Sequence, residues 1–205
     1  MRQPVDRRLL RGAQSRQAIA RHAVDVASLE GLTGLSLGRL ATDLGLSKSG
    51  VQTLFVTKEN LQLAAVESAG EAFSGAVIRP ALEAPRGAAR LRALVERWIA
   101  YVETPLFPGG CFWVANLAEF DSRPGQVRDA LLRHQHDWTA RIAAELRHAA
   151  ELEEIADLDA ELAAFQIDAV LRAANTALRL GDDEAPDKVR RVVAGFLRPA
   201  PARRT

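Results

Sequence analysis

A run of polar residues between positions 47 and 53 carries side chains that can read DNA. Its hydrogen-bonding members are Ser47, Lys48, Ser49, Gln52 and Thr53. A glutamine amide bonds bidentately to adenine, hydroxyl groups bond to phosphates or base edges, and a lysine contacts guanine or phosphate. Gly50 lies in the same run and costs a helix about 1 kcal/mol relative to alanine, which a close approach to DNA explains better than packing does. The alternative is that the run is simply the solvent-exposed side of a helix.

Capping residues and a glycine predict the elements that hold this run. Ser36 can cap a helix over residues 37–43, Gly45 turns the chain, and Ser47 can cap a second helix over residues 48–54. Two short helices joined by a glycine turn are typical of a helix-turn-helix, whose second helix enters the major groove. The pair must be small or apolar where its helices meet, which the sequence satisfies with Leu40, Ala41, Leu46 and Val51.

Basic residues around this motif are candidates for phosphate contacts. Thr57 can cap a helix that begins at Lys58, and Arg39 lies in the first short helix; for both basic residues the alternative is ordinary exposure. Residues 1–14 are expected to form a flexible arm, whose arginines could reach the minor groove or could belong to a disordered terminus: Arg2, Arg7, Arg8 and Arg11. The candidate DNA-contacting residues are therefore Ser36, Arg39, Ser47, Lys48, Ser49, Gly50, Gln52, Thr53 and Lys58.

Helical patterns continue through the rest of the chain, and no alternating pattern predicts a strand. We expect an all-α protein of about nine helices, with a three-helix head and a larger helical-bundle body. Besides the two short helices, the predicted segments are 16–29, 58 to a break bracketed by Pro80 and Pro85, 88–103, 111–120, a long helix after the turn 121–125 to about Glu151, 158–180 capped by Asp157, and 186–198. The predicted domains are the arm 1–14, the helix-turn-helix 15–60, the ligand-binding and dimerisation body 61–198, and a tail 199–205.

The last two predicted helices are apolar on more than one side. One row contains Leu158, Leu162, Phe165 and Ala169, and a second row contains Ile167, Val170, Ala174 and Leu178. One row can face the body while the other faces a second subunit. We therefore expect a homodimer through these helices.

Composition narrows the classes of protein. The chain has 205 residues, 48% of them hydrophobic and 26% charged, as in soluble globular proteins. Residues 1–60 carry nine Lys or Arg against five Asp or Glu, whereas residues 61–205 carry eighteen against twenty-one, so the head is basic and the body mildly acidic. No apolar run is long enough for a bilayer and no secretory signal is visible, so we expect a cytoplasmic protein without membrane contact.

Metal, cofactor and enzyme chemistry are not expected. The single cysteine, Cys111, forms no intrachain disulfide and is expected to be a buried small hydrophobe, with a redox-sensing thiol as the alternative. A structural zinc site needs several close Cys or His residues. The motif Glu-x-x-His of carboxylate metal centres occurs once, at Glu145–His148, and the chain has neither a P-loop nor a nucleophile elbow.

The amino-terminal segment resembles the TetR family of transcriptional regulators. The resemblance covers about residues 15–65 and rests on Ile19, Ala23, Gly31-Leu32, Leu37-Gly38-Arg39-Leu40-Ala41, Leu44-Gly45-Leu46-Ser47-Lys48-Ser49-Gly50-Val51, Phe55 and Lys58-Glu59-Asn60-Leu61. Gln52 replaces the aromatic residue usual in this family, so the phosphate contact of that aromatic is replaced or lost. Residues 109–112, 119–121 and 123–125 also look like the carboxy-terminal domain of one branch of the family, without indicating a role.

The resemblance implies a dimer that binds an inverted-repeat operator, represses a neighbouring gene and leaves DNA when a small molecule enters the body. The alternatives are a helical dimer whose head no longer reads DNA and an all-helical enzyme. Aromatic residues and one amide are candidates for an apolar ligand cavity, with core packing as the alternative for each: Trp98, Tyr101, Phe112, Trp113, Asn116, Phe120, Trp138 and Phe165.

Overall fold

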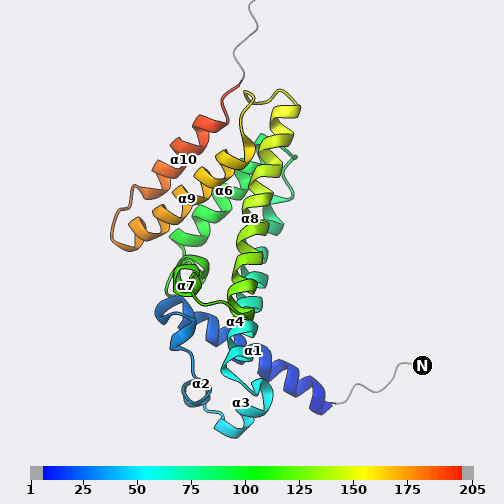
Figure 1. The fold of residues 1–205 in the computed structure, drawn as a ribbon, viewed down its shortest axis with the longest axis vertical. Coiled ribbons are helices and arrows are strands. Elements are labelled where there is room, and N and C mark those ends of the chain that lie inside the picture. Colours follow the sequence, from blue (N-terminus) through cyan, green and yellow to red (C-terminus); the bar gives the residue numbers. More distant parts are fainter. Residues whose placement is uncertain (1–6, 200–205) are drawn as a thin grey trace, which may run out of the picture. The chain divides into compact units, whose positions relative to one another are not determined.

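The computed structural model describes the backbone of residues 7–199 and the side chains of residues 12–199. Within that range the predicted all-α fold is confirmed, with nine helices of seven residues or more and no strand. In chain order the elements are α1 (Arg7–Glu30), a 3-10 turn (Leu32–Gly34), α2 (Leu37–Asp43), α3 (Lys48–Phe55), α4 (Lys58–Phe73), a π-helical turn (Ser74–Ile78), α5 (Arg79–Ala81), α6 (Ala88–Glu103), α7 (Phe112–Phe120), α8 (Gln126–Glu151), α9 (Ala160–Arg179) and α10 (Ala185–Phe196) (Figure 1).

The helices form two compact units, each built from two stretches of the chain. The first unit holds the described residues up to Ala72 together with Phe107–Leu131, so α7 packs with the amino-terminal helices. The second unit holds Phe73–Leu106 and the described residues from Leu132 onward. The boundaries of these units differ from the predicted functional boundary near residue 60, because α7 packs on α1.

The three-helix head of the first unit forms around a small apolar core. α2 and α3 pack on each other and both contact α1, with Leu40, Ala41 and Val51 buried as expected. Leu46 was expected to join them, but 43% of it is exposed. The reason is local: Gly45 turns the chain at a φ of 64°, and the Leu46 nitrogen then bonds back to the Ala41 carbonyl oxygen, which leaves Leu46 in the turn ahead of α3.

Two predicted boundaries need correction at the start of helices. α1 begins at Arg7 rather than near residue 16, because the intervening residues contain no proline and include good helix formers such as leucine and arginine. The arm predicted for residues 7–14 is thus helical, and residues 1–6 lie outside the described range. α9 begins at Ala160 and not at residue 158. Its cap is Asp159, whose carboxylate accepts hydrogen bonds from the backbone nitrogens of the next turn, rather than Asp157.

The break predicted between Pro80 and Pro85 follows α5. The helical path continues from α4 through the π-helical turn into the short α5, which contains Pro80 and ends at Ala81. Gly87, at a φ of 94°, precedes α6, so the break falls between α5 and α6.

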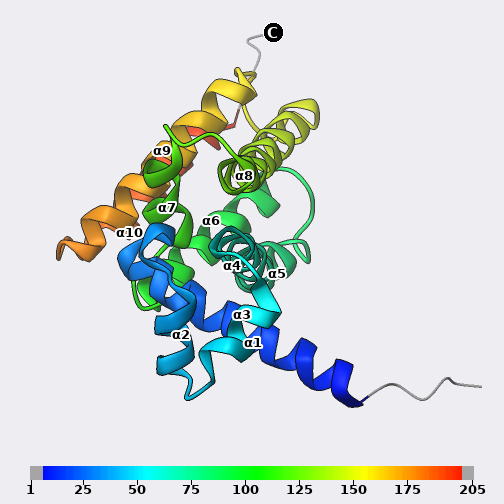
Figure 2. The same cartoon turned by 60° about the horizontal axis from the view of Figure 1, so that its bottom comes forward.

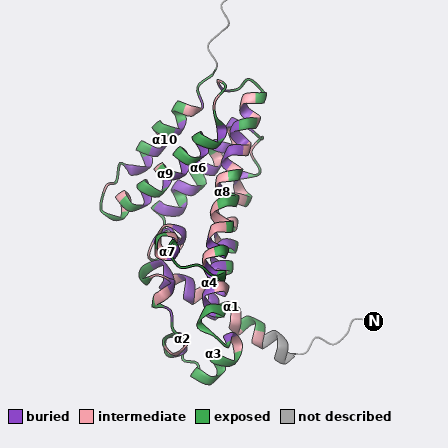
Figure 3. Cartoon of the chain, in the orientation of Figure 1, coloured by how far each residue is buried: buried purple, intermediate pink, exposed green. Residues whose placement is uncertain are grey.

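The second unit is a bundle whose core follows the predicted helix faces. α6 occupies the predicted range, and its predicted core-facing stripe is buried: Leu91, Leu94, Val95, Trp98, Ile99 and Val102. α9 and α10 pack side by side, and Arg190 of α10 bonds to Glu96 of α6 at 3.0 Å. Figure 3 shows the buried sides of these helices turned toward one another. None of the described helices combines the length and apolar character needed to cross a membrane.

Candidate DNA-binding surface and ligand-binding residues

α3 is divided into a buried side and an exposed side. Val51 and Phe55 are 1% exposed and hold the helix in the head. The polar run predicted to read DNA lies on the other side, where Ser47, Lys48, Ser49, Gly50, Gln52 and Thr53 are all exposed. Figure 2 shows α3 beside α2 and α1. The structure thus presents the whole run on one surface, as a major-groove helix requires.

Local hydrogen bonds fix the start of α3 and occupy part of the polar run. The Ser47 hydroxyl accepts a 3.1 Å bond from the Gly50 nitrogen, which confirms the predicted cap, and the Thr53 hydroxyl donates to the Ser49 carbonyl oxygen at 2.8 Å. A Cβ at Gly50 would lie 2.9 Å from the Ser47 hydroxyl oxygen. The glycine therefore leaves room for the cap, which is a second reason for it besides an approach to DNA.

Lys48 extends over the neighbouring helix. Its Cε atom lies 3.8 Å from where a Cβ at Gly38 of α2 would stand. The lysine stem therefore crosses the helix pair while its side chain stays exposed at the surface.

Arg16 of α1 secures the other end of α3. Its guanidinium donates a 2.7 Å bond to the Leu54 carbonyl oxygen and lies 4.5 Å from the centre of the Phe55 ring. These contacts satisfy a carbonyl at the helix end and fix the helix against α1. No spacing in the sequence connects residues this far apart, so sequence reasoning missed Arg16.

Arg39, predicted to contact phosphate, is paired within the head. Its guanidinium bonds to both carboxylate oxygens of Glu30 and lies 3.6 Å from Asp43, which in turn lies 3.1 Å from His22. The hydrogen bond from Arg39 holds the pKa of the Glu30 carboxyl below its usual value. Because these carboxylates offset the charge of Arg39 and compete for its donors, we leave Arg39 out of the proposed contacts. Ser36 is also occupied, since it caps α2 by accepting from the Arg39 nitrogen.

Lys58 is the first residue of α4 and directly follows the predicted cap, Thr57. The Thr57 hydroxyl accepts a 3.1 Å bond from the Asn60 nitrogen. The exposed Lys58 ammonium donates a 2.5 Å bond to the Thr33 carbonyl oxygen, in the 3-10 turn after α1. An ammonium has three donors, so this bond leaves donors for a phosphate.

The predicted ligand-binding residues divide equally between the two units. Phe112, Trp113, Asn116 and Phe120 belong to α7 in the first unit and are buried. The Asn116 amide accepts from the Leu32 nitrogen at 2.7 Å and donates to the carbonyl oxygens of Ala27 and Phe112 at 3.2 and 2.8 Å. Because both atoms of the amide already have protein partners, we leave Asn116 out of the proposed ligand contacts.

The other four predicted residues belong to the second unit. Trp98, Tyr101 and Trp138 are buried, but Phe165 is 67% exposed on α9, so we leave it out of the proposed ligand contacts. It lies on the outer side of α9 because the packed side of that helix is filled by smaller residues such as Ala163, Ala164 and Ile167. Phe73 makes edge-to-face contacts with Tyr101 and Trp138, each at 5.4 Å between ring centres.

A buried carboxylate lies next to this aromatic cluster. Asp168 of α9 is 6% exposed; Gln135 donates to it at 2.8 Å and the Arg172 guanidinium lies 3.3 Å away. Burial raises the pKa of the Asp168 carboxyl, which Arg172 and the hydrogen bonds from Gln135 and Trp138 oppose only in part. Sequence reasoning missed Asp168, although an acidic residue directly after the apolar Ile167 was a usable signal.

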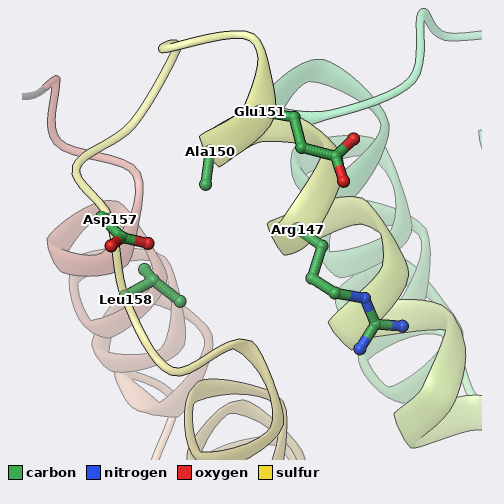
Figure 4. Close-up of a pocket in the computed structure, with 5 residues that line it drawn as sticks. All are labelled: Arg147, Ala150, Glu151, Asp157 and Leu158. Carbon is green, nitrogen blue, oxygen red and sulfur yellow. The ribbon is translucent and has the colours of Figure 1, made fainter.

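A hollow elsewhere in the second unit does not coincide with the predicted ligand residues. It measures about 320 Å³ and lies between the end of α8 and the segment before α9, lined by Arg147, Ala150, Glu151, Asp157 and Leu158 (Figure 4). Arg147 also pairs with Glu161. Its charged, open lining differs from the apolar cavity that was expected.

Comparisons with known proteins agree with this architecture. Residues 87–193 match the family model described as "Tetracyclin repressor-like, C-terminal domain". A TetR transcriptional regulator from Chloroflexus aurantiacus has a similar fold, with a TM-score of 0.80 and 22% identity over 91% of this chain and 94% of that one. AibR, solved with isovaleryl coenzyme A and operator DNA, gives a TM-score of 0.73 and 18% identity over 90% and 99% of the two chains.

The reduced form of NemR from E. coli gives a TM-score of 0.75 and 17% identity over 92% of this chain and 99% of that one. Comparison with curated protein sequences finds no significant match. The family match covers more than half of the chain, which therefore belongs to the TetR family, whose members are ligand-responsive DNA-binding transcription regulators rather than enzymes.

Proposed function

We propose that this protein is a repressor that binds an inverted-repeat operator as a homodimer and leaves it when a small molecule binds the body. The single observation that carries the proposal is the exposed polar side of α3, held by a cap at one end and by Arg16 at the other. A rigid helix with an exposed hydrogen-bonding side suits insertion into the major groove. As a DNA-bound regulator without a membrane segment among its described helices, it would act in the cytoplasm.

The proposed DNA contacts fall into two classes. Gln52 and Lys48 are exposed on α3 and would bond to base edges, with Ser47, Ser49, Gly50 and Thr53 beside them. Lys58 would bind a phosphate from the start of α4. Gln52 would thus read a base edge from the position at which the family usually has an aromatic residue that contacts phosphate.

The proposed dimer uses the outer sides of α9 and α10. Leu162 and Phe165 of the first predicted row are 53% and 67% exposed, and Val192 of α10 is 39% exposed. Large apolar side chains gathered on paired helices are typical of a subunit interface. Two heads joined in this way would meet half-sites about 34 Å apart on one side of the duplex.

The proposed ligand site lies among the aromatic side chains of the second unit. Trp98, Tyr101 and Trp138 remain the candidates, and Asp168 adds a buried polar group beside them. AibR was solved with a coenzyme A thioester, which illustrates the kind of small molecule that a similar fold accepts. Ligand binding and DNA binding would oppose each other reciprocally, since each favours a different state of the dimer.

Selection from a random duplex library tests this function without knowledge of the operator. The proposal predicts enrichment of an inverted repeat and salt-sensitive binding of one dimer per site, measured by fluorescence anisotropy against a scrambled duplex of equal length. Equal, weak binding to every duplex would favour the alternative, a helical dimer whose head no longer reads DNA. A Gln52→Ala variant serves as the comparison, because it removes a base-reading group from an exposed position.

A further inference from the structure

The glycine-rich segment before α7 and the acidic end of α7 have no part in the proposed function so far. In the structure both belong to the first unit, where they meet the segment that follows α1. The Gly109 nitrogen donates a 2.9 Å bond to the Ser28 hydroxyl, and a Cβ at Gly109 would overlap the Ser28 carbonyl oxygen. Only glycine permits this approach, so the segment is fitted closely to the end of α1.

Glu119 of α7 bonds to the 3-10 turn that follows α1. Its carboxylate accepts bonds from the Thr33 nitrogen, at 3.3 Å to each oxygen, and from the Thr33 hydroxyl. The carboxylate occupies the space above Gly31, where a Cβ would lie 2.6 Å from the nearer oxygen. Gly31 itself has a φ of 76°. A glycine here therefore serves both the backbone turn and the approach of Glu119.

The same turn holds the proposed phosphate contact. While the Thr33 nitrogen and hydroxyl face Glu119, the Thr33 carbonyl oxygen accepts the Lys58 ammonium. Gln62, one turn further along α4, donates a 2.9 Å bond to the Leu32 carbonyl oxygen. Residues of α7, the 3-10 turn and α4 are thus joined by consecutive hydrogen bonds within one unit.

We infer that Glu119 is a positioning residue for DNA binding: by holding Thr33, it fixes the carbonyl oxygen that orients the Lys58 ammonium toward the DNA phosphate. The inference rests on the proposed function. We name the bonded group formed by Glu119, Thr33 and Lys58 the clasp. A lysine side chain has many rotamers, and fixing one before binding reduces the conformational entropy lost on the DNA.

The test compares Glu119→Gln with Glu67→Gln, a matched change at an exposed glutamate on α4 of the same unit. Both variants lose one negative charge, which alone would favour DNA binding. The clasp predicts that Glu119→Gln nevertheless weakens binding to the selected duplex by roughly three- to tenfold. Glu67→Gln should keep or slightly tighten binding.

A second variant separates positioning from general stability. In a Lys58→Ala background, Glu119→Gln should have no further effect on the dissociation constant, because the group that it orients is gone. Hydrogen exchange of the Leu32 and Thr33 amides, measured without DNA, should speed up in Glu119→Gln and not in Glu67→Gln. An equal affinity of wild type and Glu119→Gln, or an undiminished effect in the Lys58→Ala background, would overturn the clasp alone. A wild-type chain that binds no duplex would overturn the proposed function and this inference with it.

Discussion

Asn116 of α7 accepts a 2.7 Å hydrogen bond from the backbone nitrogen of Leu32, a residue 84 positions earlier in the chain. Both side chains are fully buried. With its two donated bonds, the amide satisfies one nitrogen and two carbonyl oxygens in the core of the first unit. A buried polar group with all its partners in place is a strong local constraint, because losing any partner leaves a buried group unsatisfied.

Replacing Asn116 should destabilise the protein strongly. Asn116→Ala leaves the Leu32 nitrogen unpaired and opens a cavity, which we expect to cost about 2–4 kcal/mol in the free energy of unfolding. Urea denaturation followed by circular dichroism measures this. Asn60→Ala, at an exposed position of α4, is the control and should change stability by less than about 0.5 kcal/mol. Equal stability of the two variants would contradict the structural role.

Gly109 should tolerate no side chain. Gly109→Ala would push a methyl group into the Ser28 carbonyl oxygen. The methyl carbon is bonded directly to the backbone and the oxygen belongs to the backbone of α1, so no side-chain rotation relieves the overlap and the chain must move. We expect a loss of about 1–3 kcal/mol, measured by thermal unfolding. Gly12 of α1 has open space around it, so Gly12→Ala should stabilise the helix by roughly 0.5–1 kcal/mol. A Gly109→Ala protein as stable as wild type would show that the close fit is absent in solution.

Much of this fold is local enough to be predicted from sequence. The caps at Ser36, Ser47 and Thr57 lie within three residues of the nitrogens they satisfy, so their helix starts were predicted correctly. The same holds for the buried stripe of α6, which follows from helical periodicity.

Contacts between distant residues could not be predicted in this way. Asn116 was expected to face a ligand because a lone amide in an apolar helix suits either role, and only the return of α7 to α1 decides between them. Arg39 was a candidate phosphate contact, and no rule of sequence spacing could connect it with Glu30 across a turn. The two polar residues that we no longer propose as contacts are therefore ones whose side chains bond to distant parts of the chain.

Phe165 should control the oligomeric state. Phe165→Asp would place a charge in the centre of the proposed apolar interface, so we expect a monomer by analytical ultracentrifugation at concentrations where wild type is a dimer. Leu152→Asp is the matched control, since Leu152 is 55% exposed at the end of α8, and it should remain dimeric. A dimeric Phe165→Asp protein would move the interface away from this side of α9.

The buried Asp168 should make stability depend on pH. Because burial raises its pKa in the folded state, the folded state binds a proton more readily than the unfolded state; this contribution to stability is complete below the unfolded pKa and is lost as the pH rises through the folded one. Asp168→Asn keeps the shape without the charge. The stability of Asp168→Asn relative to wild type should therefore rise as the pH increases from below the ordinary pKa of an aspartate carboxyl.

Urea denaturation at several pH values measures this difference. Asp137→Asn, at an exposed position of α8, is the control for the removal of one carboxylate from the same unit. A relative stability of Asp168→Asn that falls with pH would mean that the pairing with Arg172 outweighs burial.

The central claim is that the exposed side of α3 reads sequence, and the direct test is the ratio of affinities for the selected duplex and a scrambled one. Fluorescence anisotropy at two salt concentrations measures this ratio for wild type, Gln52→Ala and Lys58→Ala. We predict that Gln52→Ala lowers the difference in binding free energy between the two duplexes by about 1–3 kcal/mol. Lys58→Ala should weaken binding to both duplexes similarly and reduce the salt slope by about one. If neither Gln52→Ala nor Lys48→Ala changes this ratio of affinities from its wild-type value, the result would contradict the claim that α3 reads the operator.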